Sequence, residues 1–251
     1  YQSRLRSSRC KPSMVNFDTD RIVIVYYKAG SGGKTVANLL GLSNNVVLQD
    51  HKIAAQQLNG ELGTTDKLKL LLTRIQATSV EWDDLRMGCT QLFNMPSDVY
   101  LKDFPQLKEY WFFDPVIDRL SNSNQYFTLM CNSVSVLKPM LECWPNAQLI
   151  RFDNPRQLIA ELRPSWVNPN ANIEYETKYD AIEIEQLEML AKNLKFVYNW
   201  DSKYLLDTDA TAANAEKLYT ALGLTDYKDI AVRAFHKAWL SKVKELRDNE
   251  Q

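Results

Sequence analysis

A glycine-rich segment between Lys28 and Thr35 is the strongest chemical signal in the sequence. It reads Lys-Ala-Gly-Ser-Gly-Gly-Lys-Thr. Successive glycines let the backbone turn its N–H groups inward, and the N-terminus of a following helix adds the positive end of its dipole. This combination is suited to binding a phosphate. Within it, Lys34 can place a positive charge on the terminal phosphate, and the Thr35 hydroxyl can lie near Mg²⁺.

The segment matches the phosphate-loop pattern G-x-x-x-x-G-K-[ST] at its last three positions but not at its first. Gly33, Lys34 and Thr35 agree with the pattern, whereas Lys28 stands where a glycine is expected. The alternative is a glycine-rich turn from strand to helix that binds no ligand. The loop residues that we predict to hold a nucleotide phosphate are Gly30, Ser31, Gly32, Gly33, Lys34 and Thr35.

The elements on either side of the loop favour the phosphate-binding interpretation. Residues 21–27 form a continuous β-branched and aromatic run, which is typical of a strand buried on both faces. Residues 36–42 have helical spacing. A strand, a glycine loop and a helix in this order are the context that a phosphate loop needs.

The rest of the chain predicts an α/β protein. Strands that alternate with helices indicate βαβ units, and we expect a three-layer P-loop fold with a mostly parallel central sheet flanked by helices. The stretch 81–119 resists assignment and is a candidate wall for a substrate. The further strands are expected at 46–48, 126–131, 147–152 and 195–198, and the helices at 51–62, 66–80, 134–143, 155–162, 181–193, 210–222 and 229–248.

Composition narrows the class of protein. The 251 residues are 45% hydrophobic and 24% charged, with a formal charge of −1, so we expect no nucleic acid partner. No apolar run approaches the roughly 18–20 residues of a membrane span. Four cysteines without paired spacing predict a cytoplasmic chain with free thiols, and two isolated histidines do not form a typical zinc site.

The chain is expected to contain one domain, at residues 14–251. Residues 1–13 are basic and rich in serine and precede Met14, so we predict an added or flexible leader; a basic arm for nucleic acid or membrane is the alternative. Asp50 and Asp153 each follow a predicted strand, where a carboxylate can reach a metal but more often caps a helix. His51 follows Asp50, and His236 lies in an amphipathic helix, where we expect it to pack.

The order of elements, together with three stretches of sequence, resembles the sulfotransferase family, which shares the P-loop fold. Residues 137–156 are similar to the family's passage of helix, strand and Arg-Asn-Pro motif. Asn199-Trp-Asp201 and the run from Leu218 to Leu224 resemble the C-terminal helices of divergent microbial and phage members. The resemblance spans most of residues 21–246.

This resemblance implies a donor, 3′-phosphoadenosine 5′-phosphosulfate, whose 5′-phosphosulfate lies on Gly30-Ser-Gly-Gly33, and a small-molecule or glycan acceptor. The family's loop lysine aligns with Gly30, so Lys28 or Lys34 would replace it. The position of the family's histidine base falls near Cys131, which leaves His51 as our candidate base. The positions that bind the donor 3′-phosphate fall near Asp153 and Glu161, where Arg151 and Arg156 would have to compensate for the negative charges.

Two other functions remain open. An ATP-dependent kinase acting on a small molecule or nucleotide would use Lys34, Thr35 and a strand-end aspartate with Mg²⁺. A nucleotide-binding module without catalysis would account for the departures from the sulfotransferase pattern. Fold alone does not choose among the three functions.

Overall fold

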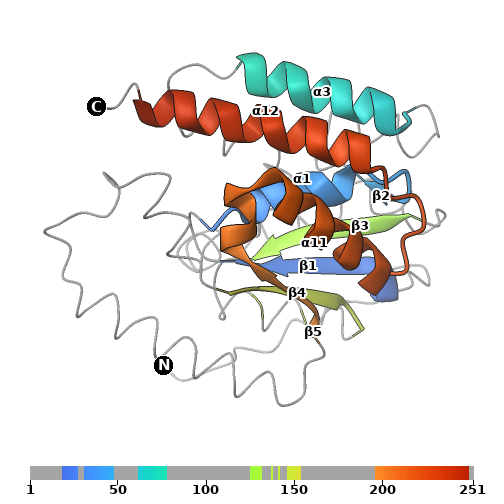
Figure 1. Ribbon diagram of the computed structural model, residues 1–251. Coiled ribbons are helices and arrows are strands. Elements are labelled where there is room, and N and C mark those ends of the chain that lie inside the picture. The colour runs from blue at the N-terminus through green and yellow to red at the C-terminus, as the bar shows by residue number, and fades with distance from the viewer. Residues whose placement is uncertain are drawn as a thin grey trace, which may run out of the picture.

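The computed structural model describes residues 19–27, 31–47, 62–77, 125–131, 137, 141, 146–153 and 196–248. These residues form a twisted sheet with helices stacked over one of its faces (Figure 1). The predicted leader at 1–13, the helices predicted at 155–162 and 181–193, and nearly all of that predicted at 51–62 lie outside the described residues. Leu137 and Leu141 are helical, as predicted for 134–143.

Within the described residues the sheet contains five strands, and every neighbouring pair is parallel. In spatial order the strands are β2 (Val46–Val47), β3 (Tyr126–Cys131), β1 (Ile22–Tyr26), β4 (Gln148–Asp153) and β5 (Phe196–Asp201). The prediction of an α/β fold around a parallel sheet is therefore confirmed. From the central β1 the chain crosses to β2 at one edge, whereas from the neighbouring β4 it goes to β5 at the other edge.

Strand β1 is buried along its whole length, as its apolar sequence predicts. Side chains alternate between the two faces of a strand. Val23 and Val25 join the core formed with the helices, and Ile22, Ile24 and Tyr26 are buried as well. In register, Tyr26 pairs with Cys131 of β3 on one side and with Arg151 of β4 on the other. The carboxyl end of β1 therefore has neighbouring strands on both sides.

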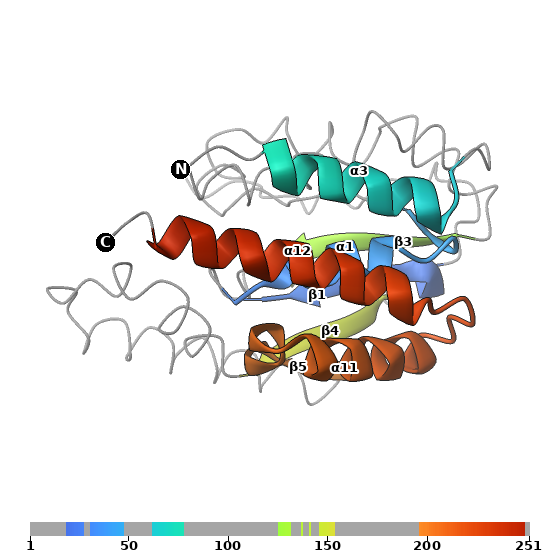
Figure 2. The ribbon, with the colours of Figure 1, turned by 45° about the horizontal axis from the view of Figure 1, so that its top comes forward.

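Two helices, α1 (Gly33–Gly41) and α11 (Thr208–Ala221), lie against the sheet, and two more lie outside them. The outer helices are α3 (Thr64–Ala77) and α12 (Asp229–Asp248), which run side by side (Figure 2). Leu71 and Ile75, one helical turn apart in α3, are both buried, as expected for the apolar face of an amphipathic helix. None of the helices within the described ranges is long and apolar enough to cross a membrane.

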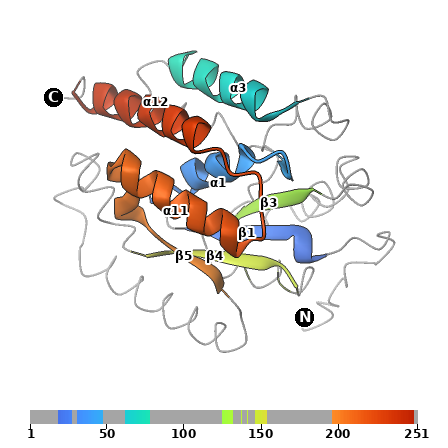
Figure 3. The ribbon, with the colours of Figure 1, turned by 45° about the vertical axis from the view of Figure 1, so that its right-hand side comes forward.

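The described C-terminal part, residues 196–248, begins with β5 and a 3₁₀ turn, η3 (Ser202–Leu206), that leads into α11 (Figure 3). The strand extends beyond the predicted 195–198 to Asp201, whose carboxylate accepts a hydrogen bond from the Lys203 N–H at 3.0 Å. Asp207 caps α11 by accepting from the Ala210 N–H at 2.7 Å. The helix thus starts two residues before its predicted first residue, Ala210. A shorter 3₁₀ turn, η1 (Thr19–Arg21), precedes β1.

Candidate phosphate-binding site

The described part of the glycine loop runs from Ser31 into the first turn of α1. Ser31 is fully buried, and Gly32 takes the N-cap position with φ 84° and ψ 18°. This left-handed conformation suits glycine, because a Cβ there meets the neighbouring carbonyl oxygen. The predicted residues Lys28 and Gly30 lie outside the described residues.

Gly33 is required by a close approach to Tyr27, the residue that leaves β1. An ideal Cβ on Gly33 would lie 2.7 and 2.8 Å from Cδ2 and Cβ of the Tyr27 side chain, too close for any side chain. The start of α1 therefore lies on the residue after β1. This contact gives a steric reason for the glycine that precedes Lys34 in the motif.

The N-terminus of α1 has the features of an anion site. Its first turn reads Gly-Lys-Thr-Val and contains no acidic residue. The Val36 N–H donates to the Gly32 carbonyl at 3.1 Å, and the N-cap residue Gly32 has no side chain with which to cap the helix. The earlier N–H groups of a helix have no partner within the helix. They can therefore donate to a bound anion, with the half-buried Lys34 beside them and Thr35 buried one residue further on.

Arg151 pairs in register with Tyr26, the last residue of β1, but its side chain lies on the face of the sheet opposite α1. Ile150, its neighbour in β4, packs in the core with α1, and side chains alternate along a strand. Its Nη2 lies 3.3 Å from Oδ1 of Asp153, and its guanidinium lies over the Phe196 ring, 5.4 Å from the ring centre. A phosphate at Arg151 would have to compete with Asp153 for the guanidinium.

The ends of β4 and β5 carry two carboxylates, each with a cation of its own. Asp153 pairs in register with Asp201, whose Oδ2 lies 2.9 Å from Nζ of Lys203. The Lys203 side chain is half exposed, and this ion pair raises its pKa, chiefly through the hydrogen bond to Asp201. Asp153, a candidate Mg²⁺ ligand in the sequence, is thus engaged with Arg151. Asp50, His51, Arg156 and Glu161 lie outside the described residues.

His236 packs in the core, as its amphipathic helix predicts. Its Nε2 lies 3.1 Å from the Leu205 carbonyl and from Oγ1 of Thr211, whose hydroxyl donates to the Tyr204 carbonyl at 2.6 Å. Because a carbonyl only accepts, Nε2 carries the proton, and Nδ1 accepts from the Thr208 hydroxyl at 3.1 Å. Burial lowers the pKa of His236 to about 4, so the imidazole is neutral at pH 7.

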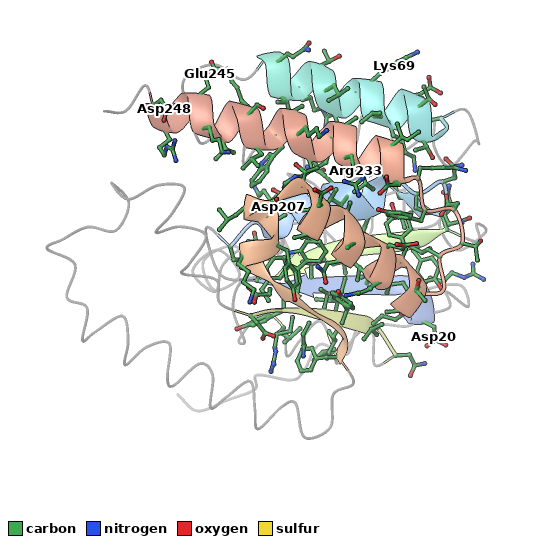
Figure 4. The ribbon with its side chains drawn as sticks, viewed as in Figure 1. Asp20, Lys69, Asp207, Arg233, Glu245 and Asp248 are labelled. Carbon is green, nitrogen blue, oxygen red and sulfur yellow. The ribbon has the colours of Figure 1, made fainter. Side chains whose placement is uncertain are left out.

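Near His236, α12 is also joined to the start of α11 by charge. Arg233 of α12 pairs with Asp209 of α11 and with Asp229 of its own helix. Figure 4 labels Arg233 on α12 and Asp207 just before α11. His236 and Arg233 thus both tie α12 to the start of α11, and neither belongs to the loop.

Sequence reasoning missed one buried charge-bearing side chain, Lys67 of α3. The side chain is fully buried, and its Nζ donates to the carbonyls of Ser43 at 2.5 Å and Val46 at 2.8 Å. The available signal was its spacing, because Lys67 precedes Leu71 and Ile75 on the buried stripe of the helix. The turn that it contacts precedes β2, so it lies at the amino end of the sheet, away from the loop.

No family model, curated protein or solved structure matches this chain. The likeness to sulfotransferases therefore rests on the residues quoted from the sequence, and the candidate site rests on the geometry of residues 31–35.

Proposed function

We propose that the chain binds a nucleotide phosphate at residues 28–35 and acts as a sulfotransferase-like group-transfer protein with a three-layer P-loop fold. The observation that carries the proposal is the left-handed Gly32 and the packing of Gly33 on Tyr27, directly after the central parallel strand. Ligands of open α/β sheets bind beyond the carboxyl ends of the strands, where neighbouring connections leave in opposite directions. The connections from β1 and β4 leave in this way.

The chemistry follows from the groups around the loop. The N–H groups of residues 30–33 and the helix dipole would hold the 5′-phosphate, and Lys34 or Lys28 would stabilise charge on the group in transfer. In sulfuryl transfer, a bond forms between the acceptor oxygen and sulfur while the bond from sulfur to the phosphate oxygen breaks. The acceptor hydroxyl gives its proton to a base, for which His51 is the candidate.

A kinase is the second candidate, and the pairing of Arg151 with Asp153 favours it. A 3′-phosphorylated donor needs a cation for its extra phosphate, and this arginine already has a carboxylate partner. Mg²⁺-ATP has no 3′-phosphate and therefore does not need this arginine. It would use Lys34 on the terminal phosphate and the Thr35 hydroxyl near the metal.

Thermal unfolding with a panel of ligands tests the proposal. The panel contains 3′-phosphoadenosine 5′-phosphate, Mg²⁺-ATP, Mg²⁺-GTP and inorganic sulfate or phosphate. A ligand at about 100 times its Kd adds about 2.7 kcal/mol to the free energy of unfolding, which raises Tm by a few degrees. We expect the 3′-phosphorylated nucleotide to raise Tm and Mg²⁺-ATP not to.

Two lysine variants locate the binding. Lys34→Ala should remove the ligand-dependent rise in Tm, whereas Lys69→Ala, which alters an exposed lysine of α3, should keep it. A rise with Mg²⁺-ATP alone would replace the sulfotransferase with the kinase. No rise with any ligand would refute phosphate binding at the loop, and with it both the sulfotransferase and the kinase.

A further inference from the structure

A network of polar groups joins three segments at the amino end of the sheet. The Lys67 amine donates to two carbonyls of the turn 43–46, which connects α1 to β2. Asp226, in the loop between α11 and α12, accepts from the Ser43 hydroxyl at 2.7 Å and from the Asn44 N–H at 2.5 Å. The turn is thus held from α3 on one side and from the 222–228 loop on the other.

The geometry around Nζ suits an uncharged amine. A neutral amine has two N–H donors, and the structure provides the Ser43 and Val46 carbonyls as two acceptors. An ammonium group would bring a third N–H and a full charge into a place from which water is excluded. Asp226 lies close enough to act on this charge, but its two oxygens accept from Ser43 and Asn44.

We propose that Lys67 is a proton-dependent clamp, which fastens α3 to the turn 43–46 most firmly when its amine is uncharged. The clamp is independent of the phosphate site, because its groups lie at the opposite end of the sheet. A change of pH around neutrality then alters how firmly α3 is held, without any ligand.

The direction of the pH effect follows from the pKa of Lys67. Burial lowers this pKa from 10.5 to about 7, and the charge of Asp226 opposes the shift. Between pH 7 and 10.5, unfolding therefore takes up a proton, and the folded state becomes more stable as the pH rises. Below pH 7 the amine is charged in both states, and its burial penalty is present in full.

Two neighbouring phenols do not account for such a slope. The pKa of Tyr219 is raised above its usual range, first by burial and then by Asp226, so its phenol keeps its proton in this window. Burial, followed by Asp229, raises the pKa of Tyr227 in the same direction. The titratable and charged groups of the described elements around the clamp are Asp66, Lys69 and Arg74 on α3, Tyr219 on α11, Asp226, Tyr227 and Lys228 in the loop, and Asp229 and Arg233 on α12.

Urea unfolding of the ligand-free chain between pH 6.5 and 9.5 tests the clamp. We expect the native sequence to take up about one proton on unfolding in the upper part of this range. Lys67→Met, which keeps the length of the side chain but not its amine, should reduce the uptake by that proton. Lys69→Met is the matched control, since it removes an exposed lysine two residues away, and it should keep the native slope.

A measurement on the native sequence covers the case in which Lys67→Met fails to fold. The NMR shift of the Lys67 Cε should titrate near pH 7, and the amides of α3 should exchange with solvent faster at pH 6 than at pH 8, after correction for the intrinsic rates. A Cε that titrates near 10.5, or a Lys67→Met variant with the native slope, would overturn the proposal.

Discussion

The two ends of α1 are built in opposite ways. At its start, Gly32 and Gly33 hold the turn by backbone shape and close approach, and the N-cap glycine has no side chain to cap the helix. At its end, the Tyr219 hydroxyl donates to the Leu39 carbonyl at 2.7 Å, and Lys67 donates to the carbonyl of Ser43 just beyond the helix.

This difference separates a helix end that can receive a ligand from one that is closed by the protein. Polar backbone groups of a buried helix end need partners. Where side chains supply them, as at residues 39–46, a ligand would find the acceptors already in use. At Gly32 and Gly33 the backbone sets the shape of the turn, and the first N–H groups have no partner within the helix, which suits an anion. The contrast supports placing the phosphate at the start of α1.

The largest expected loss of stability comes from Gly33→Ala, at the start of α1. The new Cβ collides with the Tyr27 side chain, and overpacking of this kind costs about 3 kcal/mol. The free energy of unfolding in urea should fall by that amount, and protection by the nucleotide should be lost. Gly63→Ala is the control, because its Cβ would have open space around it. Equal stability of the two variants would refute the close approach.

Much of the frame could be predicted from local sequence, and the reasons are physical. Strands β1 and β3 are continuous apolar or β-branched runs, and α12 has a strong helical period, so their bounds follow closely from their residues. The start of a helix at the glycines after β1 was likewise predicted from local sequence, whereas phosphate binding by the loop stays a prediction.

The remainder depends on contacts between residues far apart in the chain. The hydrogen bond from Ser43 to Asp226 joins positions separated by 183 residues, and no local pattern indicates it. From the sequence alone, Lys67 is expected on the surface. Only the packing of α3 shows that it is buried on the same face as Leu71. The sequence placed Arg151 near a phosphate, whereas the folded sheet gives it Asp153 as a partner.

A smaller loss of stability is expected from Tyr219→Phe, which removes a hydrogen bond at the end of α1. The ring keeps its contact with Tyr227, but the Leu39 carbonyl loses its shorter hydrogen bond. Removing one partner of a buried hydrogen bond costs about 2 kcal/mol, which urea unfolding measures. Because this end does not receive the ligand, the ligand-dependent rise in Tm should stay as in the native sequence. Loss of that rise would show that the two ends are not independent.

The smallest expected changes in stability concern Gly32 and Gly223, the glycines with a left-handed conformation at described helix ends. Gly223, with φ 71°, follows α11, and the Leu224 N–H donates back to the Tyr219 carbonyl at 2.9 Å, which closes that helix without a ligand. Nothing lies within 4 Å of a Cβ placed there, so Gly223→Ala adds only backbone strain, about 1 kcal/mol.

Gly32→Ala imposes the same left-handed strain at the start of α1, and there we also expect protection by the nucleotide to fall. Urea unfolding and the ligand panel, applied to both variants, separate the two roles of glycine. Gly223→Ala should lower stability alone, because its helix end is closed by backbone bonds. If Gly32→Ala likewise lowered stability and left the rise in Tm intact, the glycine at the start of α1 would serve the turn and not the ligand.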